Sequence, residues 1–156
     1  MAGFATKGAY MPKIAVKKLD ERAVLPTYGS AFSAGADLYA VLDGELIIQP
    51  SETKLVRTGL AMEIPEGFAG LIYARSGLAT KRGLAPANKV GVVDADYRGE
   101  IMVALHNHSA VPQTVAVGER IAQLVVAPFL KAEFEEADEL SSTVRGEGGF
   151  GSTGRK

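Results

Sequence analysis

The sequence predicts an all-β protein of the sandwich or jelly-roll type, and three observations carry this prediction. Eighteen glycines and seven prolines divide the 156-residue chain into short segments. Between these breaks, most apolar residues form short runs or alternate with polar residues, which is typical of β-strands. Only residues 76–82 have the pattern of a helix, and it is short. Many closely spaced strands favour a sandwich or jelly roll over a doubly wound sheet.

The individual elements follow from this pattern. The helix at 76–82 has Ser76 at its start, where a serine side chain can cap the first turn. Residues 101–105 are apolar on both faces, so we expect that strand to be covered on both sides. The predicted strands are 68–74, 101–106, 114–117 and 120–127.

The composition changes near both ends. Residues 1–11 resemble a flexible extension, and residues 133–156 are acidic and then glycine-rich, which is typical of a mobile arm. Residues 12–132 form the expected single domain, long enough to bury a core without disulfides.

Charge and composition exclude several classes of function. The net charge is -1 at pH 7, so no overall basic field exists for nucleic acid or an anionic membrane. The absence of cysteine excludes disulfides, thiol nucleophiles and a His/Cys/Cys zinc site. No apolar run is long enough to span a membrane, and we see no signal peptide. We expect a cytoplasmic protein, with nucleus or organelle as alternatives in a eukaryote.

Five segments stand out because of their order and spacing. They are AGADL at 34–38, ARSGLA at 74–79, GVVDADYRG at 91–99, GERIAQL at 118–124 and RGEGGFGSTG at 145–154. Taken together they resemble the five motifs of the trimeric dUTPase family, over nearly the whole chain. The resemblance implies a β-jelly-roll fold, a homotrimer with three-fold symmetry, and active sites built from more than one subunit. It also implies Mg²⁺-dependent hydrolysis of dUTP to dUMP and diphosphate, which limits uracil in DNA and supplies dUMP for dTMP synthesis.

The second and fourth segments carry the predicted phosphate contacts. Serine and glycine at a helix start present amides and a hydroxyl to an anion, and arginine adds charge-assisted donors. On pattern alone this is equally a capped helix with a solvated arginine. Gln123 is expected to share a strand face with Ile121, Val125 and Ala127, where a buried amide needs a partner: backbone, another subunit or ligand. By resemblance, the phosphate contacts are Arg75, Ser76, Gly77 and Gln123.

The third segment carries the predicted catalytic base. Asp94 and Asp96 are expected in a hairpin or its turn, where aspartates are common for structural reasons. The resemblance implies that Asp94 holds the attacking water in line with the α-phosphorus, and Asp96 is expected to be structural. It also implies that Tyr97 lies against the deoxyribose and excludes a 2′-hydroxyl. The resemblance further implies that uracil is read by a hairpin that includes Asn88 and Gly91.

The metal is expected to need few protein ligands. On its own, Asp37 is a turn-flanking carboxylate that pairs with an arginine; by resemblance it reaches Mg²⁺ through water, with the ion held mainly by substrate phosphates. His106 and His108 could ligate a metal, but no third ligand is evident, so we interpret them as surface or interface residues.

The glycine-rich end has two interpretations. Residues 146–151 match the dinucleotide fingerprint G-x-G-x-x-G, but too few residues follow for the required helix. A disordered end is the simpler interpretation. The resemblance instead implies an arm that folds over the nucleotide, with Arg145 on phosphate, Phe150 on uracil, and Gly151, Ser152 and Thr153 around the γ-phosphate.

Two alternatives from the residues stay open. A dCTP deaminase has the same general fold, and ammonia release from dCTP would favour it. A non-catalytic nucleotide sensor or interaction protein could keep the same scaffold. Diphosphate release from dUTP with magnesium separates both from the expected hydrolase.

Overall fold

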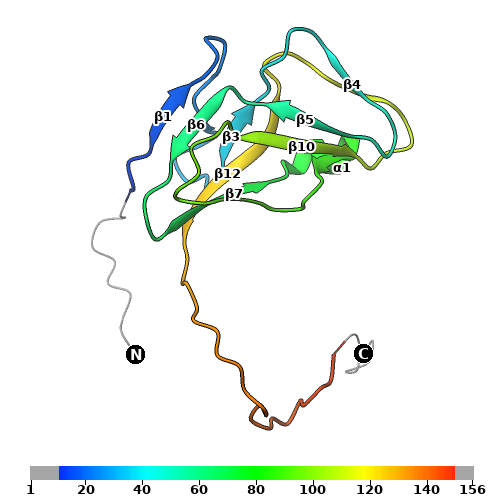
Figure 1. Ribbon diagram of the computed structural model, residues 1–156. Helices are drawn as coiled ribbons and strands as arrows, with labels where there is room; N and C mark the ends of the chain where they lie inside the picture. The colour runs from blue at the N-terminus through cyan, green and yellow to red at the C-terminus, as the bar shows by residue number, and fades with distance from the viewer. Residues whose placement is uncertain (1–10, 150–156) are drawn as a thin grey trace.

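The computed structural model describes residues 11–149. Within that range the chain forms short strands and a single helix (Figure 1). The elements, in chain order, are β1 (Ala15–Lys18), β2 (Thr27–Tyr28), β3 (Ala36–Tyr39), β4 (Leu46–Ile48), β5 (Thr53–Arg57), β6 (Leu60–Glu63), β7 (Phe68–Tyr73), α1 (Ser76–Arg82), β8 (Leu84–Pro86), β9 (Gly91–Val93), β10 (Met102–Asn107), β11 (Gln113–Val115) and β12 (Arg120–Pro128).

The strands pair across long stretches of sequence, as a jelly roll requires. The largest sheet has the order β2-β3-β12-β7-β9, and a second has the order β5-β10-β8. Two strand pairs, β1-β6 and β11-β4, complete the described part of the fold. Every pairing is antiparallel, and β12 lies between β3 and β7, far from both in sequence. The all-β prediction with one short helix is confirmed.

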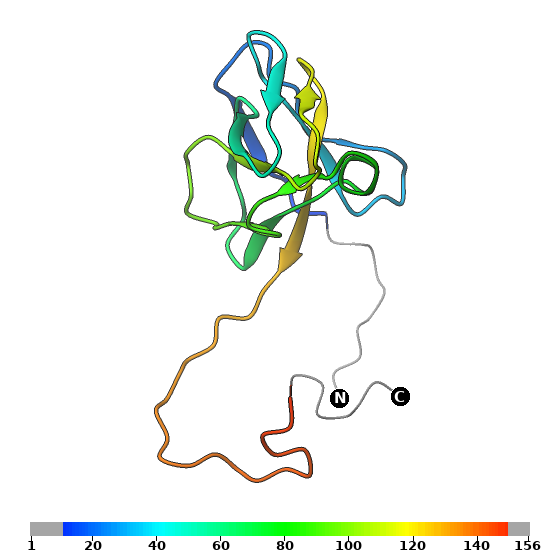
Figure 2. The same cartoon turned by 90° about the vertical axis from the view of Figure 1, so that its right-hand side faces the viewer.

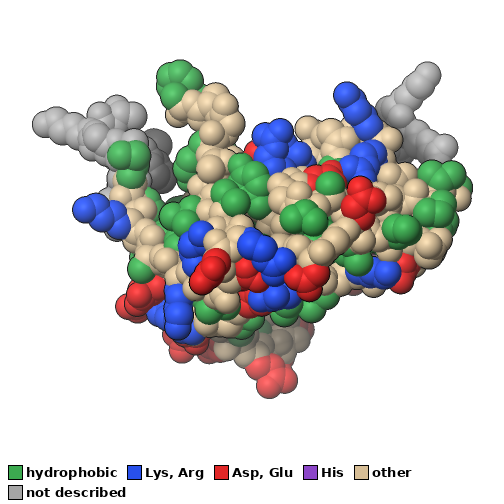
Figure 3. Space-filling model, turned by 90° about the horizontal axis from the view of Figure 1, so that it is seen from above, with side chains coloured by type: hydrophobic (Ala, Val, Ile, Leu, Met, Phe, Trp, Pro, Cys, Tyr) green, Lys and Arg blue, Asp and Glu red, His purple; other side chains and the backbone are tan. Residues whose placement is uncertain are grey.

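The hydrophobic core lies between the sheets and takes alternate residues from their long strands. Its fully buried members include Leu38 of β3, Val56 of β5 and Leu105 of β10. Outside the core, on the face seen from above, lysines and arginines are interspersed with carboxylates (Figure 3). That face therefore has no large region of one charge sign.

One expectation about strand faces is wrong, and a second is not met within a single chain. In β12 the register shifts between Arg120 and Ala122, so Ile121 is an extra residue and both Ile121 and Ala122 enter the core. Ile121 therefore does not share a face with Gln123. In β10, Val103 and its alternate neighbours are buried, but Met102 is 38% exposed on the other face. One chain alone does not cover that strand on both sides.

The helix has its predicted bounds but a different start. Arg75 occupies the N-cap position in extended conformation, and no side chain caps the helix. Ser76 is the first helical residue, and its carbonyl accepts a bond from the Thr80 hydroxyl. The helix ends at Gly83, whose φ of 68° favours glycine. The predicted serine cap is therefore wrong.

Beyond β12 the chain leaves the β-sheet body. Residues 131–147 are exposed and contain no helix or strand, and this segment extends away from the sheets (Figures 1 and 2). Among the described residues, no helix is long and apolar enough to cross a membrane.

Candidate active site

The larger of two candidate cavities, with a volume of about 820 Å³, is cationic. We call it the cationic cavity. It lies between the loop before β3, the start of α1 and the outward face of β12. Four cationic side chains and a single carboxylate line it: Arg75, Lys81, Arg82, Arg120 and Asp37. This charge balance suits a polyanion.

Asp37 organises two of these arginines. It lies within strand β3 rather than beside a turn, and it is 9% exposed. Its Oδ1 accepts a bond from Arg75 Nε at 2.7 Å, and its Oδ2 accepts one from Arg120 Nη1 at 3.1 Å. The prediction of arginine pairing is thus confirmed, with two partners. Both arginines are held in place before any ligand arrives.

Gln123 is fixed just as firmly. Its Nε2 donates to the carbonyl oxygen of Ala74 at 2.8 Å, so the amide has a backbone partner. A Cβ atom at Gly35 would lie 2.3 Å from Gln123 Oε1, which leaves room for glycine alone. The glycine of the first segment therefore allows β3 and the Gln123 side chain to approach closely.

Three cationic residues of this cavity were not predicted as site residues. Arg120 stays on the Gln123 side of β12 because of the bulge at Ile121, which the sequence does not reveal. Arg82 is held by Glu119 and Gln113, and it also donates to the Thr114 carbonyl. The sequence signal for Arg120 was its place within the fourth segment, and that for Arg82 was its proximity to the second. The third, at the end of α1, is Lys81.

The second cavity, of about 330 Å³, is more apolar. We call it the tyrosine cavity. It lies between β9, β10 and the loop that joins them. Strand residues such as Ile72 and Val103 form its walls, and Asn88, Gly91, Asp94 and Tyr97 surround it.

Asp94 directly follows β9 and begins the loop to β10. Strand β9 pairs with β7, whereas β10 pairs with β5 and β8. The loop therefore connects two sheets and closes no paired hairpin, but the predicted turn is present, because the Tyr97 amide donates to the Asp94 carbonyl at 3.2 Å. The Asp94 side chain is exposed, and among residues 11–149 it has no hydrogen bond or ion pair. A carboxylate in this state is available to hold a water molecule.

Tyr97 packs back onto its own loop. It is 44% exposed, and its hydroxyl donates to the carbonyl oxygen of Glu100 at 3.1 Å. A Cβ atom at Gly99 would lie 2.4 Å from the tyrosine hydroxyl oxygen. Glycine at 99 therefore lets the ring lie against the backbone.

Asn88 lies in the connection of residues 87–90 between β8 and β9. These strands belong to different sheets, so this connection is not a paired hairpin either. Lys89 has a φ of 66°, and the Asn88 side chain lies 3.2 Å from the position of a Cβ at Gly91. Pro86 pairs with Leu105 at the edge of its sheet, a position that tolerates proline.

The remaining predicted residues lie elsewhere. Arg145 is on the exposed segment beyond β12, and its Nε donates to the carbonyl of Gly148 at 2.6 Å. Phe150, Gly151, Ser152 and Thr153 lie outside the described residues.

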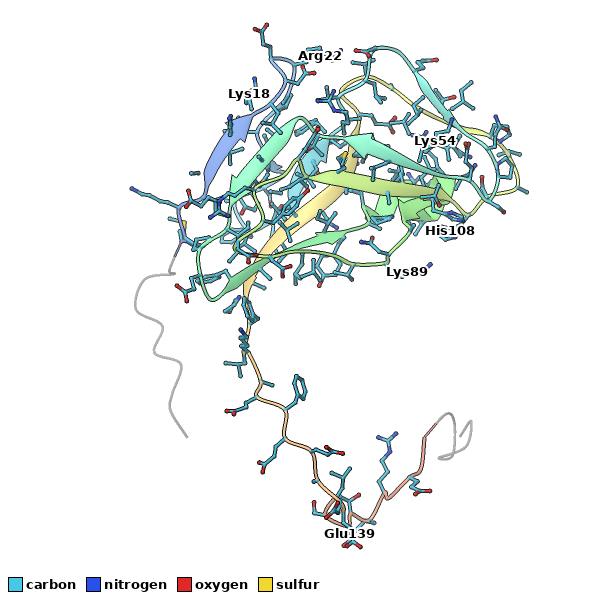
Figure 4. All side chains as sticks on the ribbon, in the orientation of Figure 1. Lys18, Arg22, Lys54, Lys89, His108 and Glu139 are labelled. Carbon is cyan, nitrogen blue, oxygen red and sulfur yellow. The ribbon has the colours of Figure 1, made fainter. Side chains whose placement is uncertain are left out.

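The two histidines form a small cluster at the end of β10. Their ring centroids lie 4.3 Å apart, and Thr53 Oγ1 lies 2.8 Å from His106 Nδ1. His108 and Lys89 lie at the same end of the fold (Figure 4). Partial desolvation, helped by His106 and Lys89, lowers the pKa of His108. Within residues 11–149 no group of three His, Cys, Asp or Glu side chains could hold a metal.

The predicted residues thus fall into two groups within one chain. Asp37, Arg75, Ser76, Gly77 and Gln123 line the cationic cavity, whereas Asn88, Gly91, Asp94 and Tyr97 line the tyrosine cavity. The two cavities have no lining residue in common.

The donor set also indicates how a divalent cation could bind. Asp37 is the only carboxylate lining the cationic cavity, and both of its oxygens already accept bonds from arginines. It therefore fits a water-mediated contact better than direct ligation. Mg²⁺, which retains waters and binds phosphate oxygens, suits such a site.

The chain is a jelly roll with one cavity suited to a polyanion and a second cavity that contains a carboxylate and a tyrosine. This combination indicates a β protein of the class that processes nucleotides. The comparisons identify the family. The dUTPase family model matches residues 21–154, and the chain belongs to that family.

Relatives of known sequence and of known structure match this chain over nearly its whole length. A deoxyuridine 5'-triphosphate nucleotidohydrolase from Hydrogenobaculum sp. is 51% identical over 92% of this chain and 99% of its own length. One from Desulfitobacterium hafniense is 52% identical over 91% of this chain and 95% of its own. A mutant of the Staphylococcus bacteriophage 80alpha dUTPase, solved with dUpNHpp, superposes with a TM-score of 0.83, at 28% identity, covering 92% of this chain and 99% of that one.

Proposed function

We propose that this chain hydrolyses dUTP to dUMP and diphosphate in a site formed between two copies of the chain. One copy contributes the cationic cavity for the triphosphate, and its neighbour contributes the tyrosine cavity for the nucleoside. One observation carries this proposal: the two cavities share no lining residue, yet the reaction needs phosphates and attacking water together.

Asp94 acts as the general base in this mechanism. Its exposed carboxylate orients a water molecule and accepts its proton as the water oxygen bonds to the α-phosphorus. The bond from that phosphorus to the bridging oxygen breaks, and diphosphate leaves. The free state of the carboxylate in one chain supports this role.

The cationic cavity binds the phosphate chain. Arg75, Ser76, Gly77 and Gln123 contact its oxygens, and the bonds that already fix Arg75 and Gln123 reduce the ordering cost on binding. Asp37 would hold a Mg²⁺ ion through water. Bound with the nucleotide, such an ion would neutralise charge that develops on the phosphate oxygens.

The tyrosine cavity selects the nucleoside. Asn88 and the backbone near Gly91 bond to uracil, whose donor and acceptor pattern differs from cytosine at one edge. Tyr97 lies against the sugar and leaves no room for a 2′-hydroxyl. Its fixed position over Gly99 supports that role.

The segment beyond β12 supplies the remaining contacts. Arg145 pairs with phosphate, while Phe150 stacks on uracil and residues 151–153 surround the γ-phosphate. The exposed path of residues 131–147 suits an arm that reaches a site away from its own sheets. Closure of this arm over a full triphosphate excludes water from the reaction.

A trimer is the assembly we propose for these shared sites. Exposed apolar side chains surround the tyrosine cavity, with Leu55 59% exposed and Val92 63% exposed. Such a patch is costly in water and suits a subunit interface. Light scattering should give three times the chain mass of 16.4 kDa.

Product analysis tests the reaction. With dUTP and Mg²⁺ we expect dUMP and diphosphate in equal amounts, and no turnover after chelation of the metal. Ammonia released from dCTP would instead identify a deaminase. Nucleotide binding with neither product would identify a non-catalytic sensor.

Subunit mixing tests the shared site. Asp94→Asn and Arg75→Ala chains should each be inactive alone. Unfolded together and refolded as mixed trimers, they should regain activity, because some interfaces then combine an intact Asp94 with an intact Arg75. No recovery in verified mixed trimers would place both residues in the same chain's site.

A further inference from the structure

The loop that carries Asp94 and Tyr97 is anchored at its far end to the turn between β5 and β6. The backbone amide of Ile101 donates to the carbonyl of Leu60 at 2.8 Å. The hydroxyl of Thr58, which is fully buried, donates to the carbonyl of Ile101 at 2.5 Å. This turn lies outside all five segments that resemble the family motifs.

Glu100 adds a charged clamp at the same point. Its Oε1 accepts a bond from the backbone amide of Gly59 at 2.8 Å. Arg57 Nε lies 3.1 Å from each of its two oxygens. The Glu100 side chain is only 17% exposed, so these bonds are shielded from solvent more than those of a surface pair.

The turn has little freedom to move. Gly59 has a φ of 67°, and a Cβ there would lie 2.8 Å from the Cβ of Ala23. Arg57 is also held from its other side by Asp20, at 3.8 Å. Glu100 is therefore attached to a rigid part of the fold.

Tyr97 depends on this clamp for its position. Its hydroxyl donates to the backbone carbonyl of Glu100, the residue whose side chain is clamped. Its ring lies over Gly99, where a Cβ would approach the ring carbon Cζ to 2.6 Å. The ring position is thus linked, through Glu100, to the end of the loop.

We propose that Glu100 is a positioning residue that, with the turn at residues 57–60, sets the Tyr97 ring and so the preference for a deoxyribose over a ribose. This inference rests on the proposed role of Tyr97. A pocket rejects an extra hydroxyl only weakly unless its wall is held firmly against the sugar. Glu100 holds that wall without touching the nucleotide.

The test is the ratio of kcat/KM for dUTP to kcat/KM for UTP in Glu100→Gln. The amide nitrogen of glutamine cannot accept from Arg57, so one side of the clamp is lost while the size is kept. We expect this ratio to fall on the order of tenfold, mainly because kcat/KM for UTP rises. A small displacement of the Tyr97 ring is enough to admit the 2′-hydroxyl of the ribose.

Glu52→Gln is the matched control. Glu52 likewise accepts a hydrogen bond from a backbone amide, that of Gln49, at 2.7 Å. It also forms a salt bridge with a cationic side chain, that of Lys54, at 3.5 Å. It lines neither cavity. A merely structural role for Glu100 would lower the thermal midpoint of both variants and leave both nucleotide ratios unchanged.

Three further single variants and one double variant separate the possible failures. Arg57→Gln should lower the ratio as Glu100→Gln does, and the double variant should add little to either. Tyr97→Phe, which deletes only the hydroxyl, should lower the ratio even if Glu100→Gln does not fold. If Tyr97→Ala reduces the ratio but Glu100→Gln and Arg57→Gln do not, the clamp is refuted and the role of Tyr97 stands. An unchanged ratio in Tyr97→Ala would refute both.

Discussion

The two cavities of this chain are prepared for their ligands in different ways. In the cationic cavity the functional side chains bind one another: Asp37 holds Arg75 and Arg120, and the Ala74 backbone holds Gln123. In the tyrosine cavity the side chains of Asn88 and Asp94 are exposed and, in the described part of the chain, unbonded. In the cationic cavity the positions of the charges are set before a ligand binds. In the tyrosine cavity the shape is set before a ligand binds, because the Tyr97 ring lies against the backbone at Gly99.

The difference reflects what each side must recognise. A triphosphate is flexible and highly charged, so fixed donors reduce the cost of ordering it. A nucleoside is rigid, so backbone geometry and a well-placed ring can select it. Asp94, the proposed base, belongs to the second side, and its exposed carboxylate is able to bind water.

The largest effect is expected from a variant that removes the proposed base from the tyrosine cavity and keeps the size of its side chain. Asp94→Asn should lower kcat for dUTP by on the order of 10²–10⁴-fold, because the amide cannot accept the proton of water. Binding of dUpNHpp, measured by calorimetry, should stay close to that of the unaltered chain. Normal turnover in this variant would reject Asp94 as the base.

Deletion of the arm tests whether the two cavities support catalysis when no arm closes over the bound nucleotide. A chain that ends before Arg145 should lose on the order of 10²-fold in kcat/KM, since water and loose phosphates then remain in the site. Gel filtration and circular dichroism should be unchanged, because the described part of the removed segment makes no contact with the sheets. Full activity in this truncation would mean that the arm has no catalytic role.

Much of the fold was predictable because local signals decide it. The helix end at residue 82 follows from the glycine at 83, which ends the helix in the left-handed region, whereas Ser76 begins the helix without capping it. The strand at 120–127 extends by only one residue to Pro128. In each case a turn or cap residue beside a periodic apolar run fixes the element.

Nine of the predicted site residues do line the two cavities, but the arrangement of those cavities was not predictable. The bulge at Ile121, which brings Arg120 to the side of Gln123, depends on pairing with β3 and has no local signature. Asn88 and Asp94 lie in turns, but these turns do not close paired hairpins, because β8, β9 and β10 pair with strands distant in sequence. Long-range pairing is what sequence periodicity does not encode.

The fixed state of the cationic cavity can be disturbed at one glycine. Gly35→Ala would place a Cβ against Gln123 Oε1, so the amide must turn away from Ala74. We expect a loss of about 1–3 kcal/mol in the free energy of unfolding and a lower kcat. Gly44→Ala is the control, because no atom lies within 4 Å of its Cβ position. Equal effects of the two changes on denaturant unfolding would show that Gln123 is not tightly placed.

The smallest effect concerns the edge of the tyrosine cavity, where His108 lies near Lys89. Because the pKa of His108 is lowered on folding, the unfolded chain binds more protons as pH falls below about 6.5. This contribution to stability is therefore complete above that pH and is lost as pH falls through the lowered pKa. The thermal midpoint should decline slightly more between about pH 6.5 and 5 in the unaltered chain than in His108→Asn. Lys89→Ser should reduce the decline in part, since it removes one of the causes. NMR titration that gives His108 a pKa at or above 6.5 would reverse the sign and contradict the prediction.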